Sequence, residues 1–526
     1  MKVLVADDLS ADGVAILQRG RGLTVDVKVG LKPAELKAII GEYDALAVRS
    51  ATKVTAEILE AGKKLKVVGR AGVGVDNVDL AVANRRGIVV MNTPGGNTIT
   101  VAELTVAMMM ALSRHLPQAT ASLKSGKWEK KRFEGRELFN KTLGVIGIGN
   151  IGSVVVDRCL GMKMKVVAFD PFITPEAATQ LGCELVELDE LYRRADYVSV
   201  HVPLSDATRN LIGKEALAKM KKGAFLVNCA RGGIVDEAAL VEALKSGHLG
   251  GAALDVFATE PPNPDNPLFR LDNFICTPHL GASTYEAQQN VATALAEQMV
   301  DYLCNQTIRN AVNVPSVSRE VLEKLGPWLS LAQKLGALAA QLGPEAVTQV
   351  EVAASGEIKD QPLKPITVQA LKGFLAALWG EPVNEVNAPV LAKERGIEVI
   401  ELRRADHTNF ASALSVRVRG KGEVFVEGTV FGHRDLRVTH VNHFDIEAEP
   451  NGTLLAMLTQ DVPGVVGRVG ARLGEANVNI ARIHLARAKA GAEAYSLVNV
   501  DAEPTPAVLE KLRATPGVLS VELVHL

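Results

Sequence analysis

A glycine-rich turn constrains the fold of this chain more than any other feature. The run TLGVIGIGNIG places Gly147, Gly149 and Gly152 at G-x-G-x-x-G spacing directly after a strand-like segment, and the next such segment, KVVAFD, ends in Asp170. The first glycine permits a tight turn, the second lets the backbone approach a pyrophosphate, and the third lets a helix pack on a strand. The following helix N-terminus offers free N–H groups to phosphates. The turn therefore predicts a dinucleotide-binding βαβ unit.

The position of Asp170 favours NAD over NADP. A carboxylate at the end of the second strand of such a unit can accept hydrogen bonds from both ribose hydroxyls, and it repels a 2'-phosphate. The alternative, a glycine-rich turn with an incidental aspartate, leaves the complete strand, turn and helix context unexplained. We therefore predict NAD as the cofactor.

Strand-like and helix-like segments alternate over the first 280 residues, which is typical of parallel sheets covered by helices. The first series of strands comprises KVLVAD, TVDVKV, ALAVRS, KVVGRAG and IVVMN. A second series begins at Thr142 and comprises TLGVIGIG, KVVAFD, YVSVHV, AFLVNCA, AALDVF and FICTPH, separated by helical segments such as Lys214–Met220 and Glu237–Lys245. The sequence thus predicts two doubly wound α/β domains.

Two helix starts are predicted where the chain passes between these domains. Thr100 and Glu103 have the T-x-x-E spacing of a capping box ahead of an apolar run, and Ser283 and Glu286 have the matching S-x-x-E spacing before a helical pattern over 285–304. The second helix would return the chain to the first domain. We therefore expect a discontinuous domain over 1–97 and 282–315, with the cofactor domain at 98–281.

The segment after NVPSVS changes character. It contains an Ala/Leu-rich helical pattern over 329–342 and the alternating runs SVRVRG, EVFVEGTVFG and RVTHVNHFDIEA, which indicate an α+β domain over 316–448. From Thr453 the chain reads strand, helix, strand, strand, helix, strand, and this order predicts a ferredoxin-like domain over 452–526.

Composition excludes several classes of protein. The 526 residues are 47% hydrophobic and 22% charged, with a formal net charge of -2, so we expect no nucleic-acid partner. The five cysteines (Cys159, Cys183, Cys229, Cys276 and Cys304) form no CxxC or Cys/His cluster, which argues against disulfides and a metal site. The run KVLVADDL after Met1 lacks a signal pattern, and no apolar run has the roughly 20 residues of a membrane span. We predict a cytoplasmic protein.

Three chemically useful side chains follow strands of the second series. Arg231 follows AFLVNCA, Glu260 follows AALDVF and His279 follows FICTP, and ligands bind beyond the carboxyl ends of strands in open α/β sheets. Removing a hydride from a carbinol requires a base, which a histidine near its ordinary pKa supplies. A carboxylate fixes the histidine tautomer, and an arginine binds a substrate carboxylate. Taken singly, each residue also fits a structural role as a cap, a loop acid or an interior histidine.

The segments LYRRADYVSVHVPLSDATRNLIG, MKKGAFLVNCARGGIVDEAAL, GAALDVFATEPP and TPHLGAST resemble signature blocks of the D-isomer-specific 2-hydroxyacid dehydrogenases, over roughly residues 1–315. The resemblance implies that Arg231, Glu260 and His279 are catalytic. It also implies a set of cofactor-binding residues: Gly147, Gly149, Asn150, Ile151, Gly152, Asp170, Pro203, Ala230, Asp255, His279, Gly281 and Ala282. Asn150 departs from the arginine common in relatives, and we expect it to alter the phosphate contacts without abolishing them.

The N-terminal runs RSATKVT, GRAGVGVDNVDL and PGGNTIT are similar to those of the family branch that oxidises 3-phospho-D-glycerate. That resemblance implies a set of substrate-binding residues: Arg49, Ser50, Arg70, Val73, Gly74, Asn97, Lys130 and Arg231. Several cations suit a substrate with a carboxylate and a phosphate, because an unpaired buried anion is costly. Lys130 belongs to the basic run KKR, which would reach a neighbouring subunit's site or be a solvated surface.

The C-terminal half resembles the intervening and ACT domains of the long forms of that branch, the latter through DVPGVVGRVGARLGEANVNIA. ACT domains usually bind amino acids between subunits. The resemblance therefore implies L-serine as an effector at Asp461 and Asn479, and a homotetramer. Asp461 could instead cap the following helix, and Asn479 could support a turn.

The implied reaction is the first step of the phosphorylated pathway to L-serine, with a side reduction of 2-oxoglutarate to 2-hydroxyglutarate. Two alternatives remain open at this point. One is another 2-hydroxyacid reductase, acting on hydroxypyruvate or glyoxylate. The other is a dinucleotide-sensing binding protein, because corepressors of this fold retain the same arginine, glutamate and histidine.

Overall fold

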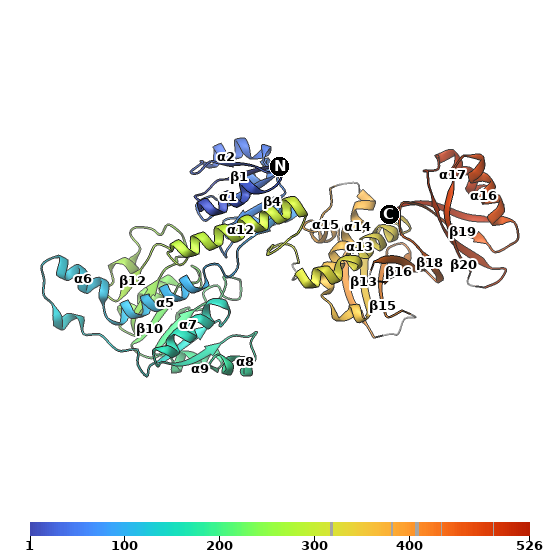
Figure 1. Ribbon diagram of the computed structural model, residues 1–526. Coiled ribbons are helices and arrows are strands. Elements are labelled where there is room, and N and C mark those ends of the chain that lie inside the picture. The colour runs from blue at the N-terminus through green and yellow to red at the C-terminus, as the bar shows by residue number, and fades with distance from the viewer. Residues whose placement is uncertain (316–318, 380–381, 406–409, 433, 488) are drawn as a thin grey trace.

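The computed structural model describes residues 1–315, 319–379, 382–405, 410–432, 434–487 and 489–526. Four sheets follow one another along the chain (Figure 1). The first two lie in doubly wound α/β units, the third in a mixed α+β unit and the fourth in a ferredoxin-like unit, so the predicted fold class is confirmed. The proposed domain boundary at 316 lies outside the described residues.

The first sheet is parallel, with strand order β2-β1-β3-β4-β5. Its order reverses between β1 and β3, which makes that edge a switch point where ligands bind. Its strands are β1 (Lys2–Val5), β2 (Thr24–Val27), β3 (Ala45–Val48), β4 (Val67–Arg70) and β5 (Val89–Met91). Its helices are α1 (Ala11–Arg19), α2 (Pro33–Ile39), η1 (Ile40–Glu42), α3 (Ala56–Ala61) and α4 (Leu80–Arg85).

The second sheet is also parallel, with strand order β12-β11-β10-β9-β6-β7-β8, and its switch point lies between β6 and β9. Its strands are β6 (Thr142–Ile146), β7 (Lys165–Phe169), β8 (Glu184–Leu185), β9 (Tyr197–Val200), β10 (Ala224–Asn228), β11 (Leu249–Leu254) and β12 (Phe274–Cys276). Its helices are α6 (Leu116–Lys124), η2 (Lys130–Phe133), α7 (Asn150–Gly161), α8 (Pro175–Gln180), α9 (Leu188–Arg194), α10 (Lys214–Lys219), α11 (Glu237–Lys245) and η3 (Pro267–Arg270).

Two long helices, α5 (Thr98–Ser113) and α12 (Tyr285–Asn305), lie where the chain passes between these sheets (Figure 1). Val291 and Leu295 of α12 belong to the core of the first unit, so the chain returns to it. Both predicted capping boxes are wrong. The N-cap of helix α5 is Asn97, three residues before Thr100, and its side chain makes no capping hydrogen bond, so Thr100 and Glu103 lie inside the helix.

The N-cap of α12 is Thr284 rather than Ser283, because the Thr284 hydroxyl accepts the hydrogen bond from Ala287 N at 3.2 Å. A Ser or Thr side chain satisfies the free amides only at the residue where the backbone enters the helix. Spacing of side chains alone does not locate that residue.

The third sheet has strand order β14-β13-β15-β16-β17-β18, in which only β13 and β14 pair in parallel. Its strands are β13 (Gln349–Gly356), β14 (Glu398–Arg404), β15 (Ser412–Arg419), β16 (Glu423–Phe431), β17 (Asp435–Val441) and β18 (Phe444–Ala448). Its helices are α13 (Arg319–Gln341), η4 (Glu357–Asp360), α14 (Leu363–Trp379) and α15 (Ala388–Glu394). Helix α13 begins earlier than the predicted 329–342.

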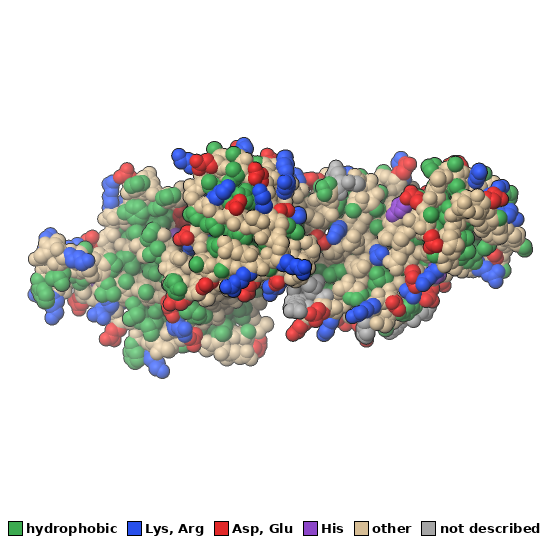
Figure 2. All heavy atoms as spheres, turned by 45° about the horizontal axis from the view of Figure 1, so that its top comes forward, with side chains coloured by type: hydrophobic (Ala, Val, Ile, Leu, Met, Phe, Trp, Pro, Cys, Tyr) green, Lys and Arg blue, Asp and Glu red, His purple; other side chains and the backbone are tan. Residues whose placement is uncertain are grey.

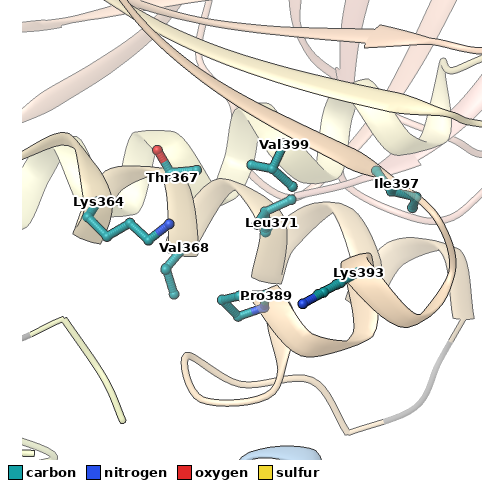
Figure 3. Close-up of a pocket in the computed structure, with 8 residues that line it drawn as sticks. All are labelled: Lys364, Thr367, Val368, Leu371, Pro389, Lys393, Ile397 and Val399. Carbon is teal, nitrogen blue, oxygen red and sulfur yellow. The ribbon is translucent and has the colours of Figure 1, made fainter. Parts of the chain in front are cut away.

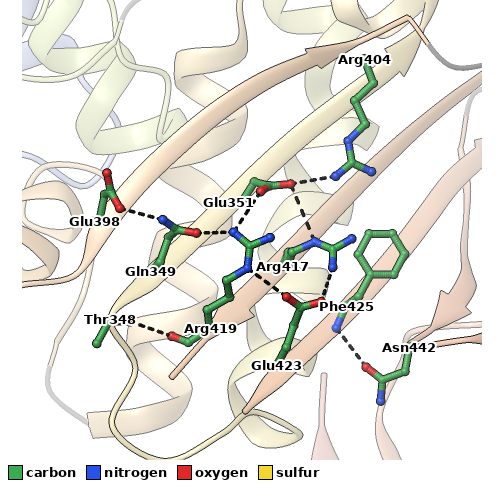
Figure 4. Close-up of polar contacts among 10 residues, drawn as sticks. All are labelled: Thr348, Gln349, Glu351, Glu398, Arg404, Arg417, Arg419, Glu423, Phe425 and Asn442. Atoms are coloured by element: carbon green, nitrogen blue, oxygen red, sulfur yellow. Dashed lines mark hydrogen bonds and ion pairs between the residues drawn. The ribbon is translucent and has the colours of Figure 1, made fainter. Parts of the chain in front are cut away.

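Alternation on these strands places an apolar face against α13 and α14 and a polar face opposite. The polar face holds a buried carboxylate, Glu351, whose side chain is 8% exposed and lies between Arg404, Arg417 and Arg419 (Figure 4). Glu423 pairs with the last two arginines. A buried charge is tolerated only when it is paired, so the arginines of this network serve to neutralise the buried carboxylate of Glu351.

The fourth sheet is antiparallel, with strand order β20-β21-β19-β22. Its elements are β19 (Thr453–Gln460), α16 (Val465–Glu475), β20 (Ile480–Arg487), β21 (Glu493–Val500), α17 (Pro506–Arg513) and β22 (Val518–His525). Leu455 and Met457 face α16 and α17, whereas Leu454 and Ala456 extend the core of the third unit. The predicted βαββαβ order is confirmed.

Charged side chains of both signs are interspersed over the face shown in Figure 2, as the small net charge predicts. Among the described residues, no single helix is long and apolar enough to cross a membrane, although α5 and α6 pass the length and composition test as a pair bent by 61°.

Candidate active site

The predicted catalytic residues, and several of the predicted cofactor and substrate residues, follow strands of the two parallel sheets. Gly147 follows β6, Arg231 follows β10, Asp255 follows β11 and His279 follows β12. Arg70 ends β4 of the other sheet. The two sets meet, because the Arg231 guanidinium contacts Gly74 and Asp76 of the first unit. The site therefore lies where the two α/β units meet, and we call this region the cleft.

The glycine turn has the geometry that a dinucleotide requires. Gly147 has φ +88, and a Cβ on Gly152 would lie 2.0 Å from the Gly147 carbonyl oxygen, so both positions exclude side chains. A Cβ on Gly149 would meet nothing within 4 Å, which leaves open space beside the N-terminus of α7. No side chain caps that helix end. The amides are thus available to a pyrophosphate, and the residues fit NAD.

Asp170 lies next to this turn. Its carboxylate accepts hydrogen bonds from Ile148 N at 3.0 Å and from Phe172 N at 2.9 Å. These bonds orient the side chain without neutralising its charge. The carboxylate is therefore positioned at the end of β7, where we predicted the ribose contact.

Asp255 organises the turn that carries His279. The fully buried carboxylate accepts hydrogen bonds from Thr277 Oγ1 at 2.6 Å, Leu280 N at 2.7 Å and Gly281 N at 2.9 Å. Burial raises the pKa of Asp255, although these hydrogen bonds and the charge of His279 oppose that rise. His279 itself has φ 55, a left-handed conformation that costs energy in a non-glycine residue. The hydrogen bonds of Asp255 fix that conformation.

His279 and Glu260 form the central acid–base pair. His279 Nδ1 lies 2.7 Å from Glu260 Oε2, and their side chains are 45% and 37% exposed. The hydrogen bond to Glu260 raises the pKa of His279 against the opposing effect of burial. Burial raises the pKa of Glu260, but the bonds from His279 and Phe257 N outweigh it, so that pKa is lowered. Because a carboxylate only accepts, Nδ1 carries the proton and Nε2 is the basic nitrogen.

Three of the predicted substrate residues are arginines: Arg231 lies on the same unit as this pair, and Arg49 and Arg70 lie on the other unit. Arg70 is half-buried, and burial together with the charge of Arg231 lowers its pKa. Arg49 is tied by its backbone N–H to Asp7 Oδ2 at 2.6 Å and by Nη1 to the Asp8 carbonyl. Neighbouring cations repel each other, so this cluster favours an anionic ligand.

The other predicted residues differ in how directly they border the cleft. Gly74 contacts the guanidinium of Arg231, and the Val73 carbonyl accepts a hydrogen bond from Asn92. Ser50 is exposed just after β3, and Asn97 has a buried Oδ1 without a hydrogen-bond partner in the described residues. Lys130 is exposed on η2.

On the cofactor side, Pro203 is exposed just beyond β9, and Ala230, Gly281 and Ala282 lie on the turns around Asp255. Ile151 is half-buried in the first turn of α7 behind Asn150. Their proposed contacts with NAD stay predictions.

Sequence reasoning missed several residues that shape the cleft. Asn228, at the end of β10, accepts from Ala230 N at 2.9 Å and donates to the Arg231 carbonyl at 2.9 Å, so it fixes the turn that presents Arg231. Asp7 follows β1, is buried, and accepts from Arg49 N and from the Thr52 hydroxyl at 2.6 Å. Asn228 and Asp7 stand at the ends of strands, and that position could have indicated them from the sequence. Asp76 lies within a loop, so no sequence pattern indicated it.

The predicted effector residues lie at opposite ends of the fourth sheet. Asp461 accepts hydrogen bonds from Gly491 N at 2.9 Å and Arg487 Nη1 at 3.2 Å, next to the end of β20. Asn479 precedes the start of β20 and donates to Asp501 Oδ2 at 2.6 Å. An eight-residue strand separates them, roughly 25 Å at about 3.3 Å per residue. One chain therefore cannot offer both side chains to one small ligand.

A separate pocket lies in the third unit between α14, α15 and the start of β14 (Figure 3). Lys364 and Lys393 border an otherwise mainly apolar lining, and the Thr367 hydroxyl donates to the Leu363 carbonyl instead of facing the pocket. The lining includes no histidine or carboxylate. It therefore lacks the acid–base pair that distinguishes the cleft.

Comparison with known proteins agrees with this geometry. Residues 106–281 match the NAD-binding domain of D-isomer-specific 2-hydroxyacid dehydrogenases, 324–442 the intervening domain of D-3-phosphoglycerate dehydrogenase, and 452–517 the ACT domain. D-3-phosphoglycerate dehydrogenases of Synechocystis and Archaeoglobus fulgidus are 46% and 44% identical over the whole chain, covering 95% and 100% of their own lengths. The NAD-bound 3-phosphoglycerate dehydrogenase of Entamoeba histolytica is 33% identical, covering 60% of this chain and 98% of its own, with a TM-score of 0.51.

Proposed function

The chain belongs to the D-3-phosphoglycerate dehydrogenases of the D-isomer-specific 2-hydroxyacid dehydrogenase family, and on that premise we propose how its cleft oxidises 3-phospho-D-glycerate to 3-phosphohydroxypyruvate with NAD. This reaction is the first step of the phosphorylated pathway to L-serine. The observation that carries the proposal is the His279–Glu260 pair with Arg231 on the same unit and with Arg49 and Arg70 on the opposite unit.

NAD accepts the hydride when it is bound. The turn from Gly147 to Gly152 would hold the pyrophosphate at the N-terminus of α7, and Asp170 would bind the adenosine ribose. Asp255 and Ala230 would border the nicotinamide. Asp255 also fixes the turn of His279, so one buried carboxylate links cofactor and base.

His279 Nε2 takes the proton of the substrate hydroxyl as the carbon–hydrogen bond breaks. Its Nδ1–H stays on Glu260, whose charge stabilises the imidazolium that forms. Because the pKa of His279 is raised, the neutral, basic form increases as pH rises through that raised pKa. Oxidation therefore speeds up with rising pH, and the reverse reduction needs the protonated form and slows.

Arg231 binds the substrate carboxylate and orients the reacting carbon. Arg49 and Arg70, on the opposite unit, bind the phosphate. Because these charges lie on two units, a substrate with anionic groups at both ends bridges them and favours closure of the cleft. The side reduction of 2-oxoglutarate stays a prediction. Its basis is that the second carboxylate of 2-oxoglutarate would meet the same arginines.

One assay tests this function. We expect NADH to form from 3-phosphoglycerate and NAD when hydrazine captures the keto product, with much slower formation from D-lactate or D-glycerate. Faster oxidation of those acids would identify a different 2-hydroxyacid dehydrogenase. No NADH from any of them, with intact NADH binding, would favour a dinucleotide-sensing protein.

The fourth unit supports a regulatory proposal. L-serine binds between two ACT domains, with Asp461 of one copy and Asn479 of a second copy, because one chain holds these side chains at opposite ends of its sheet. Such a site requires at least a dimer and suits a homotetramer in the cytoplasm. Calorimetry tests this site. A heat of L-serine binding in the wild type and none in Asn479→Ala supports the site, and equal heats of binding in both proteins contradict it.

A further inference from the structure

One ion pair crosses the cleft. Asp76 Oδ2 accepts a hydrogen bond from Arg231 Nε at 3.1 Å. Asp76 lies in the loop after β4 of the first unit, and Arg231 lies in the loop after β10 of the second, 155 positions away. The side chains are 71% and 30% exposed. The pair is therefore open to ligand and solvent, and it ties the two units together at the predicted substrate site.

The arginine is held from both sides. Its Nη1 donates to the Ala230 carbonyl of its own unit at 2.7 Å. A Cβ on Gly74 would lie 2.2 Å from Arg231 Nη2 and 2.7 Å from Asp76 Oδ2, so the bare backbone of Gly74 leaves the space in which guanidinium and carboxylate meet. For Nη2 itself, no acceptor occurs within the described residues. Arg231 thus binds one carboxylate and keeps Nη2 available to a ligand.

We propose that Asp76 stands in for the substrate carboxylate in the ligand-free cleft and is exchanged for it on binding. The inference rests on the function proposed above and adds a residue to it. A guanidinium recognises any carboxylate by the same hydrogen bonds. Substrate binding then replaces the Asp76–Arg231 pair by a substrate–Arg231 pair, and the loop after β4 is released.

The electrostatics of the cleft support this exchange. Arg49 and Arg231 both repel Arg70, and Asp76 offsets the charge of Arg70 as well as that of Arg231. An ion pair this exposed changes an equilibrium constant by roughly twofold to fivefold. It is strong enough to keep Arg231 oriented and weak enough for a substrate to displace. Because Asp76 competes with the substrate for Arg231, it lowers the affinity for substrate. Removing the Asp76 carboxylate should therefore raise that affinity.

The experiment measures the affinity of the enzyme–NADH complex for three ligands by calorimetry. 3-Phosphoglycerate carries both a carboxylate and a phosphate, D-glycerate carries the carboxylate alone, and glycerol 3-phosphate carries the phosphate alone. The variants are Asp76→Asn and Asp76→Ala. The control is Asp265→Asn, which removes another exposed carboxylate that pairs with an arginine, Arg270, at 3.4 Å on the surface.

We expect both Asp76 variants to bind 3-phosphoglycerate and D-glycerate about twofold to fivefold more tightly, with no gain for glycerol 3-phosphate and no change in Asp265→Asn. Unchanged or weaker binding of the two acids in both variants overturns the proposal, because Asp76 then only positions Arg231. An equal gain for glycerol 3-phosphate also overturns it, since the effect is then a general change of charge.

The outcome is separable from the proposed function. If the wild type forms no NADH from 3-phosphoglycerate, the proposed substrate is wrong, but the D-glycerate titration still reports on exchange at Arg231. Unfolding midpoints of the variants, measured beside that of the wild type, identify any loss of affinity caused by misfolding.

Discussion

The cleft and the third sheet each hold a histidine hydrogen-bonded to a glutamate. His279 Nδ1 lies 2.7 Å from Glu260, and His440 Nδ1 lies 3.0 Å from Glu427. In both pairs, the hydrogen bond to the glutamate raises the pKa of the histidine. The other ring nitrogen differs. His440 Nε2 is bound by Asp445 at 2.6 Å, whereas His279 Nε2 has no partner within the described residues.

A histidine–glutamate pair is therefore insufficient to define an acid–base catalyst. A catalyst needs a second nitrogen that faces a ligand, a carboxylate that sets the tautomer, and a neighbouring cation for the substrate. His279 has Arg231 beside it, and its electrostatic influence reaches both members of the pair. His440 has a carboxylate on each nitrogen and lies on a sheet face. The following predictions test this contrast.

The largest effect is expected for His279→Asn. Loss of the base should lower turnover by about 10²- to 10⁴-fold, because that is the usual contribution of a positioned acid–base group. NADH affinity, followed by its fluorescence, should stay close to that of the wild type. His440→Asn is the control, with unchanged turnover. Near-normal turnover in His279→Asn would remove this residue from the mechanism.

A smaller effect is expected for Asp170→Ala. The carboxylate repels a 2'-phosphate, so its removal should narrow the preference of kcat/KM for NAD over NADP by about tenfold or more. Asp157→Ala, which removes an exposed carboxylate paired with Arg158 on α7, is the control. Equal kcat/KM values for the two cofactors in the wild type would contradict the assignment.

Glu260→Gln should change the pH dependence more than the maximal rate. Without the glutamate charge, the pKa of His279 loses the main interaction that raises it. The rise of the oxidation rate with pH should therefore occur at lower pH than in the wild type. The check is kcat against pH in both proteins, and superimposable profiles would show that Glu260 does not tune this histidine.

The sequence predicted the cleft better than its surroundings, for a physical reason. Arg231 and His279 follow strands of one parallel sheet, and strand direction alone brings such ends together. Asp76 escaped prediction because its contact depends on how two separate units meet. Asp461 and Asn479 were paired by their order in the chain, although strand direction carries them to opposite ends of the sheet.

The helix starts failed for a different reason. T-x-x-E spacing also fits the interior of a helix, and Thr100 lies there, because packing decides where the helix begins. Glycines were predicted well where the backbone itself sets the requirement, as at Gly147 with its φ of +88. Local backbone constraints are thus read from the sequence more reliably than contacts between units.

The smallest effect concerns His440 and should appear in stability alone. The pKa of His440 is raised in the folded protein, chiefly by the hydrogen bond to Glu427 and further by the charges of Glu427 and Asp445, against burial. A raised pKa stabilises the fold below the ordinary histidine pKa of about 6.5, and the contribution is lost as pH rises through the raised value. The pair is partly exposed, so it is worth no more than about 1 kcal/mol. We expect His440→Gln to lower the denaturant midpoint more at pH 5.5 than at pH 9, with unchanged turnover, and His525→Gln to show a weaker pH dependence because its carboxylate partner lies 3.9 Å away. A midpoint difference that is the same at both pH values would contradict the prediction, because it would mean that folding does not shift the pKa of His440.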